Sequence, residues 1–323
     1  MITIQLKPKK EESLQRFHPW VFSGAIQRIE GKPAEGDSLP GLIVDVYDET
    51  AVMQAHSIGM HETREILAKA IVANVPEVKN VYYKSETTLP FKAAIEPEDG
   101  YLIGKETAQL TALENGLNFH VDWLRGQKTG FFVDQRENRS LLERYSAGKS
   151  VLNMFCYTGG FSVYALRGGA KLVHSVDSSA KAIDLTDKNV EANYPNDPRH
   201  KSFAEDAFKY LNNLHTLDQQ YDLIILDPPA FAKHREALRN ALKGYKRLNA
   251  KAFEQIKPGG IVFTFSCSQV VSKDQFRLAV FSAAAESKRN VRILHQLSQP
   301  ADHPINIYHP EGEYLKGLVL WVE

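Results

Sequence analysis

Residues 151–231 constrain the fold more than any other part of this chain. Three short apolar runs, Val151–Phe155, Leu172–Val176 and Tyr221–Leu226, each end in a loop rich in Gly, Asp or Pro, which is typical of buried strands. Segments with helical spacing, Phe161–Arg167 and Ser179–Asn193, lie between them. This alternation predicts a parallel sheet with right-handed crossovers, in which ligands bind outside the carboxyl ends of the strands.

Later segments extend the same sheet. Asp206 would follow a third short strand, and Ile261–Phe265 reads as another buried strand, ahead of Ser266-Cys267-Ser268. In the tail the alternation changes to paired strand candidates, Val291–Leu297 and Leu315–Val322, as at the antiparallel edge of a mixed sheet. We therefore expect an α/β fold with a mixed sheet.

Residues 38–125 are expected to form a small mixed α/β module that serves as a spacer or platform. Leu42–Tyr47 and Ala51–His56 predict one hairpin, and Asn115-Gly116 signals another. Val78–Lys84 reads as a strand. The segment His61–Val75 has helical spacing, with four apolar residues on one face: Ile66, Leu67, Ala70 and Ile71.

Composition excludes several classes of protein. The 323 residues carry 39 basic and 39 acidic side chains, which argues against a uniformly basic binding surface. No apolar run reaches the roughly 18 residues of a membrane span, and the first ten residues lack the apolar core of a signal peptide. Two cysteines make no disulfide scaffold, so we expect a cytoplasmic protein with free thiols, and no Cys/His cluster has zinc spacing.

The N-terminal segment has a mixed composition. Basic residues near Lys7 precede Arg16–Gly24, where Phe17, Trp20 and Phe22 alternate with polar residues. Basic and aromatic residues together are typical of a surface that contacts RNA. A loop anchored by a tryptophan in a small core is the favoured interpretation of this segment taken alone, and RNA contact is the alternative.

The loop after the first predicted strand bears on the cofactor. Thr158-Gly159-Gly160 lacks the third glycine of a dinucleotide-binding turn, so it supports a pyrophosphate site only weakly. Asp177 ends the second strand, where a carboxylate can accept from both ribose hydroxyls, and Asp206 could accept from an adenine amino group. An adenosine ligand without a pyrophosphate, such as S-adenosylmethionine, fits these positions. The segment Gly126–Gly130 does not have the spacing of a phosphate loop.

Two further loops follow the fourth and fifth strands. Asp227-Pro228-Pro229 has a stiff backbone, and Phe231 beside it could stack on a base. Cys267 could serve as a nucleophile at the same edge of the sheet, although a cysteine after an apolar strand is more often buried. Cys156 is the rival, and its place before the glycine loop suggests packing beneath the cofactor.

A basic helix is expected after Phe231. Eight Lys or Arg residues against two Glu lie between Lys233 and Lys257. At about 100° per residue, four of them fall within an arc of roughly 80° that suits a phosphate backbone: Arg235, Arg239, Lys243 and Lys246. A solvated charged face is the default alternative.

Taken together, these stretches resemble the bacterial and archaeal ribosomal large-subunit cytosine-5 methyltransferases. The resemblance covers nearly the whole chain and is carried by LPGLIVD at 39–45, GQKTGFFVDQRENR at 126–139, FCYTGGFS at 155–162, DPPAFAK at 227–233, FSCS at 265–268 and EGEYLKG at 311–317. It implies a PUA-like segment at 1–37, a central α/β domain at 38–125 and a class I methyltransferase domain at 126–323. It also implies ribosomal RNA as the partner, with no membrane, and leaves a homodimer open.

The resemblance implies roles for particular residues. Cys267 would be the catalytic nucleophile, and Asp227 would face the target base and border the cofactor. The S-adenosylmethionine site would also include Phe155, Tyr157, Thr158, Gly159, Asp177, Asp206, Ala207, Gln127, Thr129 and Phe131. RNA would be held by Phe231, Lys233, Arg235, Arg239, Lys243 and Lys246. No metal is expected.

The chain departs from the family at one place. The stretch from His18 to Gly24 looks like the opening of a PUA module, but Glu35-Gly36-Asp37 leads almost directly into LPGLIVD. Most later strands of that barrel and the linker helix of the family have no counterpart here, which puts independent RNA binding by this segment in doubt.

The expected reaction is methylation of cytosine carbon 5 through a covalent cysteine adduct. Addition of the Cys267 thiolate to carbon 6 would make carbon 5 nucleophilic, and Asp227 would stabilise the charge that develops on the base. Two alternatives stay open: methylation of an RNA nitrogen without a covalent intermediate, and a non-catalytic RNA-binding or assembly protein on a methyltransferase scaffold.

Overall fold

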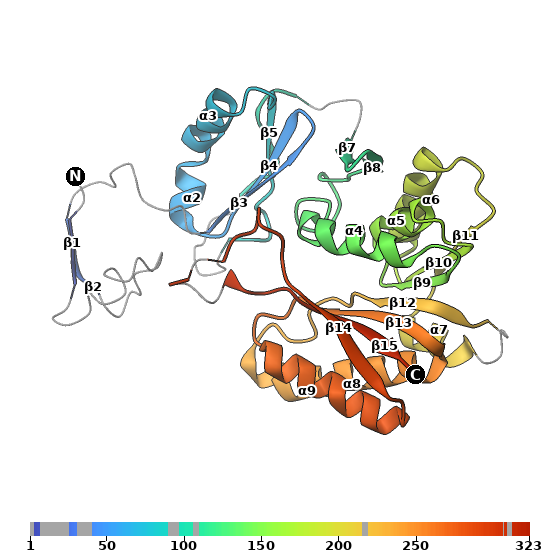
Figure 1. The fold of residues 1–323 in the computed structure, drawn as a ribbon. Coiled ribbons are helices and arrows are strands. Elements are labelled where there is room, and N and C mark those ends of the chain that lie inside the picture. Colours follow the sequence, from blue (N-terminus) through green and yellow to red (C-terminus); the bar gives the residue numbers. More distant parts are fainter. Residues whose placement is uncertain are drawn as a thin grey trace. The chain divides into compact units, whose positions relative to one another are not determined.

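The computed structural model describes residues 3–6, 26–30, 41–89, 97–105, 110–214, 219–305, 307–308 and 312–323 (Figure 1). The aromatic stretch at 16–24 and the basic patch near Lys7 lie outside these residues. The chain divides into two units. The first contains residues 1–112, 121–131 and 305–312, and the second contains residues 113–120, 132–304 and 313–323.

The first unit is built on a four-stranded sheet of order β3-β4-β5-β6, with a separate antiparallel pair, β1 (Thr3–Leu6) and β2 (Ile26–Glu30). The four strands are β3 (Leu42–Tyr47), β4 (Thr50–Ala55), β5 (Asn80–Tyr83) and β6 (Gly100–Ile103). The first predicted hairpin is confirmed, because β3 pairs antiparallel with β4 around a turn in which Asp48 has φ 51°.

The predicted helix of this unit is split in two, α2 (Ile58–Glu62) and α3 (Arg64–Asn74). The expected apolar face is partly wrong. Leu67 and Ile71 pack on the core around buried Ala68, whereas Ile66 is 68% exposed and Ala70 is exposed. The helix is therefore rotated so that a small residue, Ala68, lies closest to the sheet.

The second unit contains a seven-stranded mixed sheet of order β11-β10-β9-β12-β13-β15-β14. Five strands are parallel, and β15 runs antiparallel to β13 and to the edge strand β14. The strands are β9 (Ser150–Met154), β10 (Leu172–Asp177), β11 (His200–Ala204), β12 (Tyr221–Leu226), β13 (Ile256–Ser266), β14 (Val291–Leu297) and β15 (Lys316–Val322). This confirms the predicted parallel sheet with an antiparallel edge.

Helices cover both faces of this sheet. Figure 1 shows α4 (Arg136–Tyr145), α5 (Gly160–Arg167) and α6 (Ala180–Asn193) on one face, and α8 (Leu238–Gln255) and α9 (Lys273–Ser287) on the other. Short elements complete the unit: η3 (Val133–Gln135), α7 (Ala207–Asn213), η5 (Arg235–Ala237) and the pair β7 (Thr111–Glu114) and β8 (Leu117–His120), of which β7 begins in the first unit. The turn between β7 and β8 has positive φ at Asn115 and Gly116, as an Asn-Gly hairpin requires.

The strand order defines where a ligand can bind. The chain order runs outward from β9 through β10 to β11 and then returns to β12 on the other side of β9. In such doubly wound sheets the binding crevice lies outside the carboxyl ends of the strands at this reversal. Met154, Val176 and Leu226 lie in register across the sheet, so the loops that follow β9, β10 and β12 start side by side. The architecture is the class I Rossmann-like fold.

Candidate active site

The loop between β9 and α5 is held in an unusual backbone conformation. Phe155, Tyr157 and Gly159 have φ values of 59°, 47° and 74°, in the left-handed region that non-glycine residues rarely adopt. Asn189 Nδ2 donates to the carbonyl of Thr158, and Thr186 Oγ1 donates to that of Tyr157, both over 2.8 Å. Strained loops fixed in this way occur at ligand sites more often than elsewhere.

Gly159 is required by space as well as by backbone angle. A Cβ at this position would lie 2.6 Å from Thr186 Cγ2 on α6. The loop therefore approaches α6 more closely than any residue with a side chain permits. Thr158 is buried and Tyr157 is half-buried in this loop.

Two aspartates follow neighbouring strands. Asp177 ends β10, and its carboxylate oxygens accept from the backbone amides of Tyr157 (3.1 Å) and Ser179 (2.9 Å). Asp206 follows β11 and caps α7 by accepting from the amide of Lys209 over 2.9 Å, ahead of buried Ala207. Each carboxylate oxygen can accept a further hydrogen bond. Two fixed acceptors at adjacent strand ends, next to the glycine loop, fit the hydroxyl and amino donors of an adenosine moiety.

Asp227 directly follows β12 and belongs to a hydrogen-bonded chain. Gln135 Nε2 donates to Asp227 Oδ2 over 3.0 Å, and Asn138 Nδ2 donates to Gln135 Oε1 over 2.6 Å. Burial and the nearby charge of Asp134 raise the pKa of Asp227 to about 7, against the opposing effects of Gln135 and Arg139. A substantial fraction of Asp227 is therefore protonated at neutral pH.

Asp134 is the second carboxylate of this region. Tyr314 Oη donates to its Oδ2 over 2.7 Å. Its Oδ1 is buried without a hydrogen-bond partner among the described residues. A nearby negative charge disfavours the ionised form of a buried carboxyl group, which is why Asp134 contributes to the raised pKa of Asp227.

Cys267 follows the last residue of β13 and is half-buried, between buried Ser266 and Ser268. Tyr245 Oη of α8 accepts from Ser266 Oγ (2.9 Å) and lies 3.0 Å from Ser268 Oγ. Ser268 Oγ accepts from the backbone amide of Ala232 over 3.3 Å. The loop that carries the cysteine is thus joined to the loop that begins with Asp227.

Cys156 has a different environment, although neither cysteine forms a disulfide. It is 6% exposed, and its Sγ lies 3.6 Å from Thr186 Oγ1. Burial raises the pKa of the Cys156 thiol far above the usual range of a cysteine. Of the two thiols, that of Cys267 is the more accessible, and Cys156 packs beneath the glycine loop.

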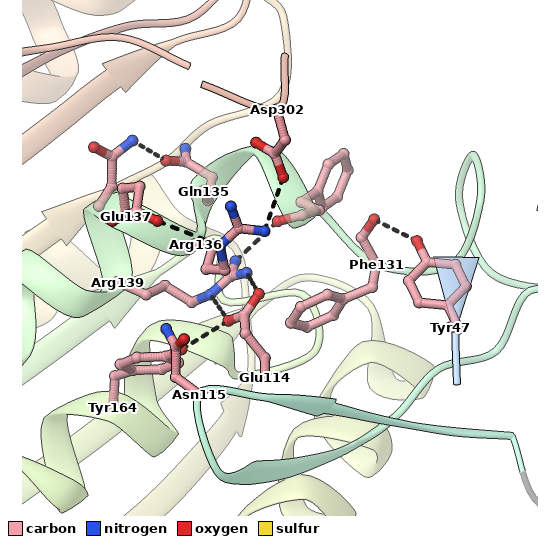
Figure 2. Close-up of polar contacts among 12 residues, drawn as sticks. Tyr47, Glu114, Asn115, Phe131, Gln135, Arg136, Glu137, Arg139, Tyr164 and Asp302 are labelled. Atoms are coloured by element: carbon pink, nitrogen blue, oxygen red, sulfur yellow. Dashed lines mark hydrogen bonds and ion pairs between the residues drawn. The ribbon is translucent and has the colours of Figure 1, made fainter. Parts of the chain in front are cut away.

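An ion pair buried in the second unit fixes the position of α4 (Figure 2). Arg139 and Glu114 are 3% and 9% exposed, and their paired contacts are 2.8 Å (Nε–Oε1) and 2.6 Å (Nη2–Oε2). Tyr164 Oη donates to Glu114 Oε1 over 3.0 Å, and Arg139 Nη1 donates to the carbonyl of Phe132 over 2.9 Å. These contacts anchor α4, which carries Asn138 and directly follows Gln135, the residue that contacts Asp227.

The predicted RNA-binding residues lie on and before α8. Phe231 is half-buried, with its ring centroid 4.7 Å from that of Tyr245, and a Cβ at Gly244 would lie 3.0 Å from its ring. Its ring therefore packs on α8. Four basic residues are exposed, namely Lys233, Arg235, Arg239 and Lys243. Lys246 instead pairs with Glu286 of α9 over 2.5 Å, so the basic surface is narrower than the sequence pattern indicates.

Gln127, Thr129 and Phe131 belong to the first unit. Thr129 Oγ1 donates to Asp45 Oδ2 over 2.5 Å and lies 3.0 Å from Tyr47 Oη, which also donates to the carbonyl of Phe131 over 3.1 Å. Thr129 and Phe131 are buried and Gln127 is exposed. Their role toward the cofactor stays a prediction.

Sequence reasoning assigned no role to several residues of the site. Asp134, Gln135 and Asn138 lie within GQKTGFFVDQRENR, and Tyr314 lies within EGEYLKG, two motifs that the sequence analysis names. Their contacts join segments far apart in the chain, and no local pattern reveals such pairs. Among the described residues there is no His, Cys, Asp or Glu cluster that could hold a metal ion, and no helix has the length and apolar content of a membrane span.

Comparison with known proteins agrees with this geometry. The profile of the S-adenosylmethionine-dependent methyltransferase family matches residues 89–310, and a PUA-like profile matches residues 4–56. The fold and the site thus define a class I methyltransferase, and the chain belongs to the S-adenosylmethionine-dependent methyltransferase family, with a PUA-like domain. S-adenosylmethionine is accordingly its cofactor.

Individual relatives of this chain have names that specify a substrate. A protein of Alteromonas mediterranea named ribosomal RNA large subunit methyltransferase I is 42% identical over 286 residues, covering 88% of this chain and 72% of its own length. Its namesake from Aeromonas salmonicida is 33% identical over 392 residues, covering 99% of each chain. That alignment is longer than the 323 residues of this chain, so the relative carries residues with no counterpart here.

A solved structure complexed with SAH (S-adenosylhomocysteine) is 28% identical and superposes with a TM-score of 0.77. The superposition covers 87% of this chain and 72% of the other. SAH is what S-adenosylmethionine becomes once its methyl group has been transferred. This likeness and the two strand-end carboxylates support the same cofactor site.

Proposed function

We propose that this chain methylates carbon 5 of a cytosine in large-subunit ribosomal RNA, through a covalent adduct with Cys267, and that it acts in the cytoplasm. The names of its relatives support the RNA substrate. The chemistry is supported chiefly by one contact, the hydrogen bond from the Ala232 amide to Ser268 Oγ, which joins the loop of Asp227 to the loop of Cys267.

Bound S-adenosylmethionine supplies an electrophilic methyl group, and the residues that would hold it are the 155–159 loop, Asp177, Asp206 and Ala207. Cys267 prepares the base to take up that methyl group. Its thiolate forms a bond to carbon 6, and the electron pair of the 5,6 double bond makes carbon 5 nucleophilic. Loss of the proton from methylated carbon 5 then restores the double bond and releases the thiolate.

Asp227 would act on the opposite edge of the base. With a pKa of about 7 it is partly protonated at neutral pH, so it can donate to the ring nitrogen where negative charge develops during thiolate addition. Gln135 and Asn138 hold the carboxyl group in one orientation. The target base must leave its stack to reach both groups, and the exposed basic residues from Lys233 to Lys243 would hold the flanking phosphates.

A covalent adduct can be trapped directly. Ribosomal RNA that contains 5-fluorocytidine would react with Cys267 and accept the methyl group, but fluorine cannot leave carbon 5 as a proton does. We expect a protein–RNA complex that survives denaturing electrophoresis and maps to Cys267 by mass spectrometry. Cys267→Ala should form no such complex, and Cys156→Ala should form it normally. Absence of a complex with the unaltered enzyme, under conditions in which it methylates normal RNA, would contradict the proposal.

Methylation of an RNA nitrogen is the second candidate. The chain from Asn138 through Gln135 to Asp227 would position an exocyclic or ring nitrogen without any need for Cys267. Nucleoside mass spectrometry of the product distinguishes the two reactions. A non-catalytic role in RNA binding would instead require that calorimetry find no S-adenosylmethionine binding.

Two further parts of this account are proposals. One is the division of the chain into domains at residues 37/38 and 125/126. The other is contact of the cofactor with Gln127, Thr129 and Phe131.

A further inference from the structure

Lys316 is a buried lysine beside the candidate nucleophile. It is 3% exposed, and lysine is almost never fully buried unless it is paired. It is the first residue of β15 and lies opposite Ser266 in the antiparallel pairing with β13. Its Nζ donates to the backbone carbonyl of Ser268 over 2.7 Å. These two positions flank Cys267, so the ammonium group lies at the segment that carries the thiol.

The ammonium group of Lys316 lacks an ion-pair partner of opposite charge among the described carboxylates. Among the described residues no carboxylate forms an ion pair with it, since Glu313 pairs with Lys273. A carbonyl oxygen satisfies one of its three donors but carries no net charge. A buried ammonium is stable only when it is paired and hydrogen-bonded. The charge of Glu313 also acts on Lys316, but Glu313 is paired with Lys273. Cys267 is a neighbouring group that can supply a further negative charge by losing its proton.

We propose that Lys316 is a positioning residue for the nucleophile, and that its ammonium group keeps Cys267 in the thiolate form before RNA binds. The benefit of this thiolate to catalysis rests on the proposed function, because the thiolate is the form of Cys267 that adds to carbon 6. The physical claim itself, a Lys316–Cys267 ion pair, can be tested without RNA and without cofactor.

The titration of Lys316 is consistent with this pair. Burial is the main cause that lowers the pKa of Lys316 to about 8; in that net value the charges of Cys267 and Glu313 oppose the shift and the charge of Lys273 adds to it. The ammonium form is therefore present below about pH 8 and is lost above it. An opposite charge within about 4–6 Å stabilises the charged form of an acid by about 1–3 pH units. The thiolate is thus expected at a pH where an ordinary cysteine is still protonated.

The test is alkylation of Cys267 by iodoacetamide from about pH 5.5 to about pH 10 in the full-length protein, followed on the Cys267 peptide by mass spectrometry. Only the thiolate reacts, so the rate reports its fraction. An ordinary cysteine gives a midpoint near pH 8.5, about the unperturbed value. In the unaltered protein we expect the midpoint to lie lower by about 1 pH unit or more.

Variants separate charge from packing. Lys316→Gln keeps a donor for the Ser268 carbonyl, and Lys316→Met keeps the aliphatic length, but both remove the charge. Each should raise the midpoint by about 1 pH unit or more, whereas Lys316→Arg should leave it near that of the unaltered protein. Lys257→Met is the matched control, because Lys257 lies near the opposite end of β13 and contacts Asp222 at 3.2 Å. It should not move the midpoint.

Two results would overturn the inference. One is a midpoint near pH 8.5 in the unaltered protein, which requires no variant to fold. The other is an unchanged midpoint in folded Lys316→Gln. Methylation by Cys267→Ala at the normal rate would remove the proposed function while leaving the ion pair intact, so the two failures are distinguishable.

Discussion

The side-chain amide of Gln135 donates to the carboxylate of Asp227 over 3.0 Å, across 92 positions of sequence. This contact connects the GQKTGFFVDQRENR motif to the Asp-Pro-Pro loop. Asn138 fixes the orientation of the Gln135 amide in turn, so Asp227 is held by two residues at the start of α4 and the turn before it.

Asp227→Asn should lower methylation and change the pH dependence of stability. The pKa of Asp227 is raised to about 7, so between its unfolded value near 3.9 and pH 7 the folded state binds more protons, and stability falls as pH rises. Asparagine resembles the protonated acid. Above pH 7 the free energy of unfolding of the variant should therefore exceed that of the unaltered protein by about 1–3 kcal/mol. This difference should vanish below about pH 4.

Denaturant titrations at several pH values measure this difference. Methylation by the same variant should fall by roughly 10²- to 10³-fold, since a positioned acid and a preorganised donor contribute about that much. Asp222→Asn is the control for the methylation rate, which it should leave unchanged, because Asp222 lies near the start of the same strand and contacts Lys257. A pH-independent stability difference for Asp227→Asn would show that Asp227 is ionised normally.

Gln135→Met should shift the ionisation of Asp227 to higher pH. The hydrogen bond from Gln135 stabilises the carboxylate and so lowers the pKa of Asp227. Methionine keeps the length of the side chain without the donor. The midpoint of the pH–rate limb that reports Asp227 should move to higher pH. An unchanged midpoint would mean that another group is responsible for this limb.

Breaking the buried ion pair should destabilise the protein strongly. Arg139→Met leaves the Glu114 carboxylate buried without its partner, which costs about 3–5 kcal/mol. Arg167→Met is the matched control, because Arg167 and Glu143 form a similar pair at 2.7 Å but are 28% and 25% exposed, and exposed pairs contribute about 0–1 kcal/mol. Equal losses of unfolding free energy in the two variants would contradict this assignment.

Gly159→Ala should weaken S-adenosylmethionine binding. The new Cβ would lie 2.6 Å from Thr186 Cγ2, and φ is 74°, so the loop must shift or accept strain of about 1–3 kcal/mol. Isothermal titration calorimetry should show roughly tenfold or greater loss of affinity. Adding Thr186→Ser removes the clashing methyl group while keeping the hydroxyl, and should restore part of that affinity. Normal cofactor affinity in Gly159→Ala would place the cofactor away from this loop.

Removing the exposed charges of Arg239 and Lys243 should weaken RNA binding and its dependence on salt. Each lost contact to a single-strand phosphate should reduce the slope of log affinity against log salt by about 0.7. Lys251→Ala is the control, because Lys251 lies on the same helix and pairs with Glu254 over 2.8 Å. Equal slopes for the double variant Arg239→Ala/Lys243→Ala and the unaltered protein would mean that RNA binds elsewhere.

The strands of the second unit were largely predictable because their apolar runs are short and end in Gly, Asp or Pro. β13 is the exception, since it begins at Ile256 rather than Ile261. Pro258, Gly259 and Gly260 argue against a strand locally. Ile256 nevertheless pairs with Tyr221 of β12, and Gly260 pairs with Val322 of β15, so tertiary pairing overrides the local preference.

The partners of the site residues could not be predicted in the same way. Lys316 lies near the start of the predicted strand Leu315–Val322, and a lysine is rarely fully buried, yet it is buried because β15 lies between β13 and β14. The hydrogen bond from Ala232 to Ser268 also depends on the neighbouring positions of β12 and β13 in the sheet. Sequence patterns locate strand ends, but sheet order decides which ends meet.

The most direct test of the account is methylation of ribosomal RNA in vitro with labelled S-adenosylmethionine, comparing the unaltered protein with Cys267→Ala and Cys156→Ala. Nucleoside mass spectrometry should find 5-methylcytidine with the unaltered protein and with Cys156→Ala. It should find none with Cys267→Ala, even though that variant still binds the cofactor. A labelled nucleoside methylated on nitrogen, or 5-methylcytidine made by Cys267→Ala at the normal rate, would contradict the covalent mechanism.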